Sequence, residues 1–143
     1  MLSDLFLGLS VSLMAMLIHL AGTLLLVVLM NPFHGVMRRR HHLRLTVALV
    51  ATYLVMLAAH VLEVGLWGLL YDFLGLVSYS EDAFYSAFVN YTTLGYGDSL
   101  RGTQTRLLGP LASANGILMF GWSTALLVLV VQRHLPAHLA TRD

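Results

Sequence analysis

The sequence predicts an all-α membrane protein in which a short re-entrant helix and an extended loop lie between the second and third of three transmembrane helices. Composition is the first observation behind this class: the 143 residues are 58% hydrophobic and 10% charged, with a mean hydropathy of +0.79, unlike a soluble domain. The second is the length of three apolar stretches, at residues 5–30, 45–71 and 107–131. Each has about 25 residues, enough to cross a hydrocarbon core of ~30 Å at a rise of ~1.5 Å per residue. The chain has no cysteine, which excludes disulfides and thiolate chemistry.

The first stretch, residues 5–30, is interpreted as a retained transmembrane helix and not as a signal peptide. It has no basic leader, carries Asp4, and is far longer than the ~7–15 apolar residues of a signal core. Asn31 and Pro32 end it, because proline lacks a backbone donor and disfavours helix at the residue before it.

A basic turn after this helix predicts the topology. It holds the densest positive cluster in the chain, made of Arg38, Arg39, Arg40 and Arg44 with His41 and His42. Short basic loops stay in the cytoplasm, so we expect the N-terminus outside and the C-terminus inside, in a plasma or inner membrane. Binding of anionic lipid headgroups is an alternative role for the same charges. Nothing predicts a nucleic-acid partner.

The second stretch, residues 45–71, then runs outward, with Trp67 and Tyr71 expected near the headgroups at its outer end. Ser78 and Glu81 have the spacing of a capping box, which predicts a helix start. The helix predicted there, residues 81–92, is too short to span the bilayer. It fits a half-inserted helix whose C-terminal carbonyl end favours a cation near the membrane centre.

The segment after this short helix reads Thr92-Thr93-Leu94-Gly95-Tyr96-Gly97-Asp98. Gly95 and Gly97 adopt a positive φ at little cost, which lets the carbonyls of residues 93–96 all turn one way. Stacked carbonyls ~3.3 Å apart would hold cations at alternate sites, where two monovalent ions repel by roughly 2.5 kcal/mol. One chain offers one strip of oxygens, so a ring of ligands implies four copies about a closed axis. An ordinary turn between two helices is the alternative.

With its flanks, this segment resembles the selectivity filter of the tetrameric potassium channels. The resemblance covers roughly residues 45–131, with residues 83–92 similar to the pore helix and residues 115–125 similar to the inner helix. It implies a homotetramer in the lipid bilayer that passes K⁺, is not an enzyme and needs no other cofactor. The implied domains are an N-terminal helix and basic loop (1–44), a pore domain (45–134) and a short tail (135–143). The implied K⁺ ligands are the filter residues Thr93, Leu94, Gly95, Tyr96 and Gly97.

The chain departs from the family pattern around this filter. Leu94 replaces the usual valine, and Tyr85 and Ser86 stand where two tryptophans usually support the filter. Val89 stands where some bacterial channels have a glutamate paired with the filter aspartate, here Asp98. With Thr92, these positions form the expected filter support, and the departures bear on filter rigidity and on the strictness of selectivity.

The inner helix carries an expected hinge at Gly116, by resemblance. A stripe at helical spacing is expected to face the cavity: Ile117, Phe120, Gly121, Thr124 and Val128. The alternative role of Gly116 and Gly121 is close helix contact within a bilayer.

Three ionisable residues, His19, His60 and Glu63, are predicted at membrane depth, where charged groups are usually paired or functional. His60 and Glu63 are three residues apart and share a helix face. Three roles are open for them. They could be a hydrogen-bonded pair that ties the second helix to the first or to the pore helix, a proton sensor, or part of a metal site. A metal needs a third ligand, and the sequence leaves the depth of His19 open. For a sensor, His60→Gln should shift the pH response of the current without changing selectivity.

The predicted function is a K⁺-selective channel. The first helix lacks the regularly spaced arginines of a voltage sensor. Two alternatives stay open, a weakly selective cation channel and a non-conducting membrane sensor or scaffold. An intramembrane hydrolase is disfavoured, because no nucleophile or complete metal triad is visible.

Overall fold

The computed structural model describes residues 2–30, 41–96 and 107–134, which fold into four helices with no strand among them. The helices are α1 (Leu2–Met30), α3 (His41–Phe73), α4 (Ser80–Tyr91) and α5 (Leu108–His134). Three of them are long and apolar enough to cross a membrane, over Leu2–Leu29, His42–Phe73 and Leu108–Arg133. The predicted class, three spans plus one short helix, is confirmed. The homotetramer stays a prediction.

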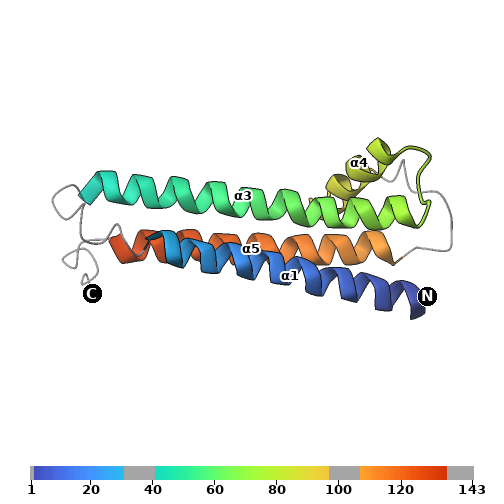
Figure 1. Cartoon of the computed structure of the whole chain (residues 1–143), viewed down its shortest axis with the longest axis horizontal. Coiled ribbons are helices and arrows are strands. Elements are labelled where there is room, and N and C mark those ends of the chain that lie inside the picture. Colours follow the sequence, from blue (N-terminus) through green and yellow to red (C-terminus); the bar gives the residue numbers. More distant parts are fainter. Residues whose placement is uncertain (1, 31–40, 97–106, 135–143) are drawn as a thin grey trace.

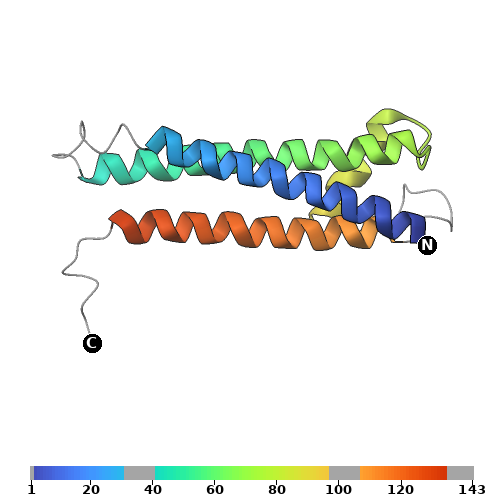
Figure 2. The same cartoon turned by 60° about the horizontal axis from the view of Figure 1, so that its bottom comes forward.

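The three long helices run side by side along the longest axis of the chain (Figures 1 and 2). α3 is antiparallel to the other two and contacts all of the other described helices. The 12 residues of α4 lie against the C-terminal half of α3, at the end where α1 and α5 begin. Since a helix of this length spans only ~18 Å, α4 cannot cross a bilayer on its own.

Aromatic side chains of α3 fill the core at this end. Trp67 and Tyr71 are fully buried, with ring centroids 6.2 Å apart, and cluster with Ala83 and Ala87 of α4. Trp67 and Tyr71 lie near the C-terminal end of α3, and their side chains pack inside the chain; their depth relative to the headgroups stays a prediction. The alanines leave room for the large rings, so α4 covers this face of α3.

The outer faces of the spans are apolar. On α1, for example, Leu9, Leu13, Leu17 and Leu24 are all more than half exposed. Leucine on the surface is costly in water and favourable in hydrocarbon, so this surface suits lipid or a neighbouring membrane helix.

α4 begins without the predicted capping box. Its N-cap is Tyr79, which makes no side-chain capping hydrogen bond, and Ser78 lies one residue further out. The backbone carbonyl of Tyr79 instead accepts hydrogen bonds from the amides of Asp82 (3.0 Å) and Ala83 (3.3 Å). Glu81 and Asp82 do occupy the first turn, where negative charge stabilises a helix.

Candidate functional site

The filter segment (residues 92–97) leaves the C-terminal end of α4 and is described up to Tyr96. Thr93 has φ 64° and Gly95 has φ 61°, whereas Leu94 between them has a negative φ. In an ordinary strand successive carbonyls point to opposite sides, so alternation of left- and right-handed residues turns them toward one side. The positive φ expected at Gly95 is present. The one at Thr93 was not expected, and Gly97 and Asp98 lie outside the described residues.

Backbone hydrogen bonds tie the filter segment to α4. The amide of Thr93 donates to the carbonyl of Asn90 (3.0 Å), and the amide of Gly95 donates to the carbonyl of Val89 (3.3 Å). These bonds satisfy carbonyls that the end of a helix leaves without partners. Among the described residues, no backbone amide donates to the carbonyls of Thr93, Leu94 or Gly95. The amides of Thr93 and Gly95 are thus used in bonds to α4, while the carbonyl oxygens of residues 93–95 stay available.

The predicted support positions on α4 differ in their surroundings. Val89 is buried and holds the filter segment through its carbonyl, not its side chain. Ser86 is also buried, and its hydroxyl donates back to the carbonyl of Asp82 at 2.6 Å. Tyr85 is 48% exposed on the single chain. The hydroxyl of Thr92 donates to the carbonyl of Phe88 (2.6 Å), which helps to end the helix.

α5 packs directly behind this end of α4. A Cβ atom at Gly116 would collide with the main-chain carbonyl of Tyr91, and the Ser113 hydroxyl donates to the carbonyl of Asn90 at 2.6 Å. Close packing is thus one role of Gly116, whereas Gly121 has no neighbour within 4 Å of an added Cβ. α5 runs unbroken through Gly116, and the hinge stays a prediction. The predicted cavity stripe is exposed at all of its positions: Ile117, Phe120, Gly121, Thr124 and Val128.

Comparison with known families matches residues 57–133, more than half of the chain, to a family described as ion channel. The matched residues run from the middle of α3 through α4 and the filter segment to the end of α5. The chain belongs to this ion channel family. No curated protein and no solved structure matches it. Membership points to ion transport by a multi-pass membrane protein and away from an enzyme; α1 lies outside the match.

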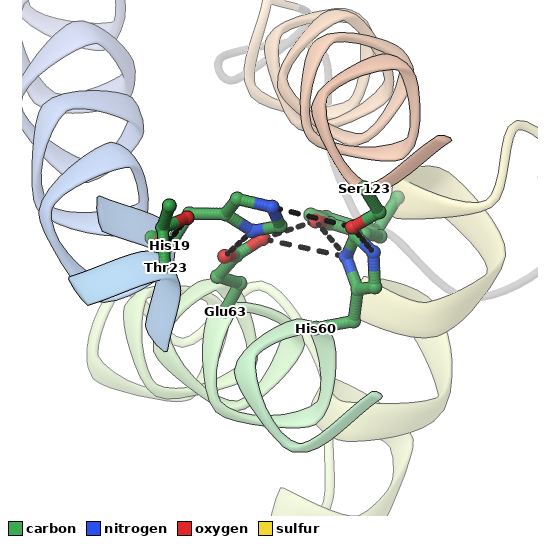
Figure 3. Close-up of polar contacts among 6 residues, drawn as sticks. His19, Thr23, His60, Glu63 and Ser123 are labelled. Carbon is green, nitrogen blue, oxygen red and sulfur yellow. Dashed lines mark hydrogen bonds and ion pairs between the residues drawn. The ribbon is translucent and has the colours of Figure 1, made fainter. Parts of the chain in front are cut away.

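The channel also buries a polar cluster to which all four described helices contribute (Figure 3). We define the polar cluster as His19 of α1, His60 and Glu63 of α3, Tyr91 of α4 and Ser123 of α5. His19 Nδ1 lies 2.7 Å from one carboxylate oxygen of Glu63, and the Tyr91 hydroxyl donates to the other. His60 Nδ1 lies 2.9 Å from the Tyr91 hydroxyl. The Ser123 hydroxyl lies 3.0 Å from His60 Nε2 and 3.2 Å from His19 Nε2, which closes a ring.

This ring of contacts is one proton short. Five contacts close it, and a hydrogen bond needs one proton at each. With Glu63 ionised and both imidazoles neutral, the groups supply only four, one each from His19, His60, Tyr91 and Ser123. One contact would then bring two lone pairs together. The polar cluster is therefore complete only when one further cation, a proton or a metal ion, lies among its groups.

The structure brings together the three ionisable residues that the sequence singled out. His19 lies at the depth of Glu63, and the hydrogen bonds tie α3 to α1 and to α4, the two partners expected for such a pair. The proton-sensing role stays a prediction. Sequence reasoning missed Tyr91 and Ser123. The signal that was present is weak: Ser123 is one of few polar residues in an apolar helix, and Tyr91 ends the pore helix.

Proposed function

We propose that the channel conducts K⁺ passively and selects it over Na⁺ by replacing the hydration shell of the ion with backbone carbonyls of the filter segment. The observation that supports this is the alternation of φ at Thr93, Leu94 and Gly95, with amides tied to α4 and carbonyls left available. Rows of such carbonyls are the coordination that potassium filters use. Identification of K⁺ as the ion also rests on the resemblance of the sequence Thr-Leu-Gly-Tyr-Gly to those filters.

Backbone strain at Thr93 supports a functional role. A β-branched residue with φ 64° is an outlier that costs on the order of 1–3 kcal/mol, and such strain persists where the surroundings enforce it. Here the bond from the Thr93 amide to Asn90 holds the residue in place. An ordinary turn would put glycine or asparagine at this position. The strained threonine therefore favours a segment shaped for its carbonyls.

The exposure of the filter segment supports assembly from four copies. Leu94 is 60% and Tyr96 66% exposed on the single chain, so the described residues of one chain do not enclose the filter segment. A dehydrated cation needs oxygen ligands on all sides, which a closed ring of identical chains supplies. In such a ring, the exposed stripe of α5 would line the cavity below the filter.

A weakly selective cation channel is the second candidate. The observation favouring it is the hydroxyl of Ser86, which is bonded to its own helix and offers no aromatic support behind Tyr96. A less rigid filter discriminates less between ions of different radius if selectivity depends on cavity size.

The orientation that we propose places the start of α1 and the filter segment outside and the end of α5 inside, in a plasma or inner membrane. Three spans put the two ends of the chain on opposite faces, and the arginine cluster at residues 38–44 favours the inner face.

Flux measurements on the purified channel test this function. In liposomes with opposed K⁺ and Na⁺ gradients, we expect a K⁺-over-Na⁺ permeability ratio well above tenfold, which corresponds to ~1.4 kcal/mol or more. A ratio near one would favour the weakly selective channel. Folded protein without flux would favour the scaffold, and a monomer by native mass spectrometry would contradict the shared filter.

A further inference from the structure

His19, His60 and Glu63 present ligand atoms to one another inside the polar cluster. One ligand atom of each lies within 4.8 Å of the others, and two of the residues are fully buried. The separations from Glu63 oxygens are 2.7 Å to His19 Nδ1 and 3.6 Å to His60 Nδ1. Tetrahedral zinc, with bonds of ~2.0–2.2 Å, holds its ligands about 3.4 Å apart. These two separations lie on either side of that value, and the third, between the histidine nitrogens, is at most 4.8 Å, so side-chain rotations must bring the two imidazoles closer together.

The outer nitrogens of both imidazoles converge on one hydroxyl. Ser123 Oγ lies 3.0 Å from Nε2 of His60 and 3.2 Å from Nε2 of His19. A hydroxyl oxygen accepts two hydrogen bonds, so Ser123 can hold both rings with the proton on Nε2. The Nδ1 lone pair of His19 is then directed at Glu63 (2.7 Å), and that of His60 at the Tyr91 hydroxyl (2.9 Å) and, further off, at Glu63 (3.6 Å). An oxygen acceptor behind each ring is the arrangement that orients metal-bound histidines.

We propose that His19, His60 and Glu63 bind a divalent transition metal of the Zn²⁺ class. The cation would lie between the acceptor atoms that face one another without a proton, Nδ1 of the two imidazoles and the oxygens of Glu63 and Tyr91. Two imidazole nitrogens and a carboxylate suit Zn²⁺, whereas Ca²⁺ and Mg²⁺ prefer oxygen alone. The fourth position lies beside the Tyr91 hydroxyl, which already contacts both His60 and Glu63.

Electrostatics at this point favour a cation. Glu63 is buried, and its ion pairs within the described part are with the two histidines alone. Tyr91 is the last residue of α4, so the negative end of this helix dipole lies next to the cluster. A route also exists, because His60 and Ser123 line a cavity of about 250 Å³ that Phe120 and Thr124 border on the exposed face of α5.

Zinc titration of the full-length channel tests the site. Protein stripped with a chelator and returned to buffer is titrated with Zn²⁺ against a chromophoric competitor; we expect one ion per chain, not displaced by excess Mg²⁺ or Ca²⁺. His19→Gln and Glu63→Gln should each weaken binding by about 100-fold or more, and Ser123→Ala by about 10- to 100-fold. His42→Gln, which changes a histidine outside the cluster, is the matched control and should bind as the parent does. Absence of stoichiometric Zn²⁺, or equal binding by His19→Gln, would overturn the proposal.

Two measurements on the parent protein test the site even if the variants do not fold. On the parent protein, Co²⁺ should give the intense visible bands of a tetrahedral nitrogen-containing site; the pale spectrum of hydrated Co²⁺ would overturn the site. Zn²⁺ affinity should fall as pH falls, because the metal displaces a proton. A parent protein that does not bind Zn²⁺ would overturn the proposal. If its melting temperature also changes between pH 5 and 8, that result favours a proton as the cation in the polar cluster. These readouts do not use flux, so they fail or succeed independently of K⁺ conduction.

Discussion

Gly116 of α5 packs against the main-chain carbonyl of Tyr91, the residue at which α4 ends and the filter segment follows. The contact leaves no room for a side chain, so α5 lies directly against the backbone at the end of α4. We therefore expect the position of the filter segment to depend on a glycine that contributes no ligand.

Gly116→Ala should destabilise the channel. The added methyl group meets backbone, which cannot rotate away, and overpacking of this kind costs ~1–3 kcal/mol. We expect a lower melting temperature in detergent. Gly121→Ala is the matched control, because nothing lies within 4 Å of its added Cβ. Equal melting temperatures for the two variants would contradict the packing role.

Gly95→Ala should abolish most K⁺ flux while the protein stays folded. Gly95 has φ 61°, where an L-residue with a side chain pays ~1–2 kcal/mol, so the carbonyl strip should rearrange. Gly65→Ala serves as control, since its Cβ would lie 3.8 Å from Phe84, an ordinary contact. Stopped-flow flux in liposomes measures both. Unchanged flux in Gly95→Ala would show that the left-handed conformation is not needed for conduction.

Tyr91→Phe should lower stability more than Tyr71→Phe does. Tyr91 donates to the buried carboxylate of Glu63, and leaving that group short of a donor costs ~1–3 kcal/mol or more. Tyr71 makes only a long contact, 3.3 Å, with the amide of Asn90 among the described residues. The two variants remove the same atom from neighbouring buried sites. Thermal unfolding followed by circular dichroism compares them, and the reverse order of stabilities would argue against an ionised Glu63.

The helices were predictable because each depends on a local pattern. The spans ending at Met30, Phe73 and His134 follow from apolar length, and α4 was expected from the acidic residues at its start and from the resemblance, although the predicted capping box did not form. Gly95 was predictable for the same reason, because a residue type alone indicates its allowed φ. These features need no knowledge of what lies across the bundle.

The polar cluster was only partly predictable, because its contacts join distant residues. His19 and Ser123 are 104 residues apart, and their meeting depends on the rotation and offset of α1 against α5. Hydropathy does not fix either quantity: a helix that is apolar on every face shows no preferred side. The burial of Trp67 was missed for the same reason, since nothing in α3 indicated that α4 would cover that face.

The membrane orientation is open to cysteine labelling, because the chain has no cysteine of its own. Leu2→Cys and Tyr79→Cys place a thiol at exposed positions at the same end of the structure, and Arg133→Cys places one at the opposite end of α5. An impermeant maleimide added to intact cells, or to spheroplasts where an outer membrane blocks access, should label the first two and spare the third until the membrane is opened.

The arginines at positions 38–40 and 44 are the physical reason for this expectation, since translocating four positive charges costs more than translocating Asp4. Labelling of Arg133→Cys alone would mean that the orientation is the reverse of the expected one, with the filter entrance inside. Labelling of Leu2→Cys without Tyr79→Cys would contradict the shared end itself, and with it the position of α4 beside the start of α1.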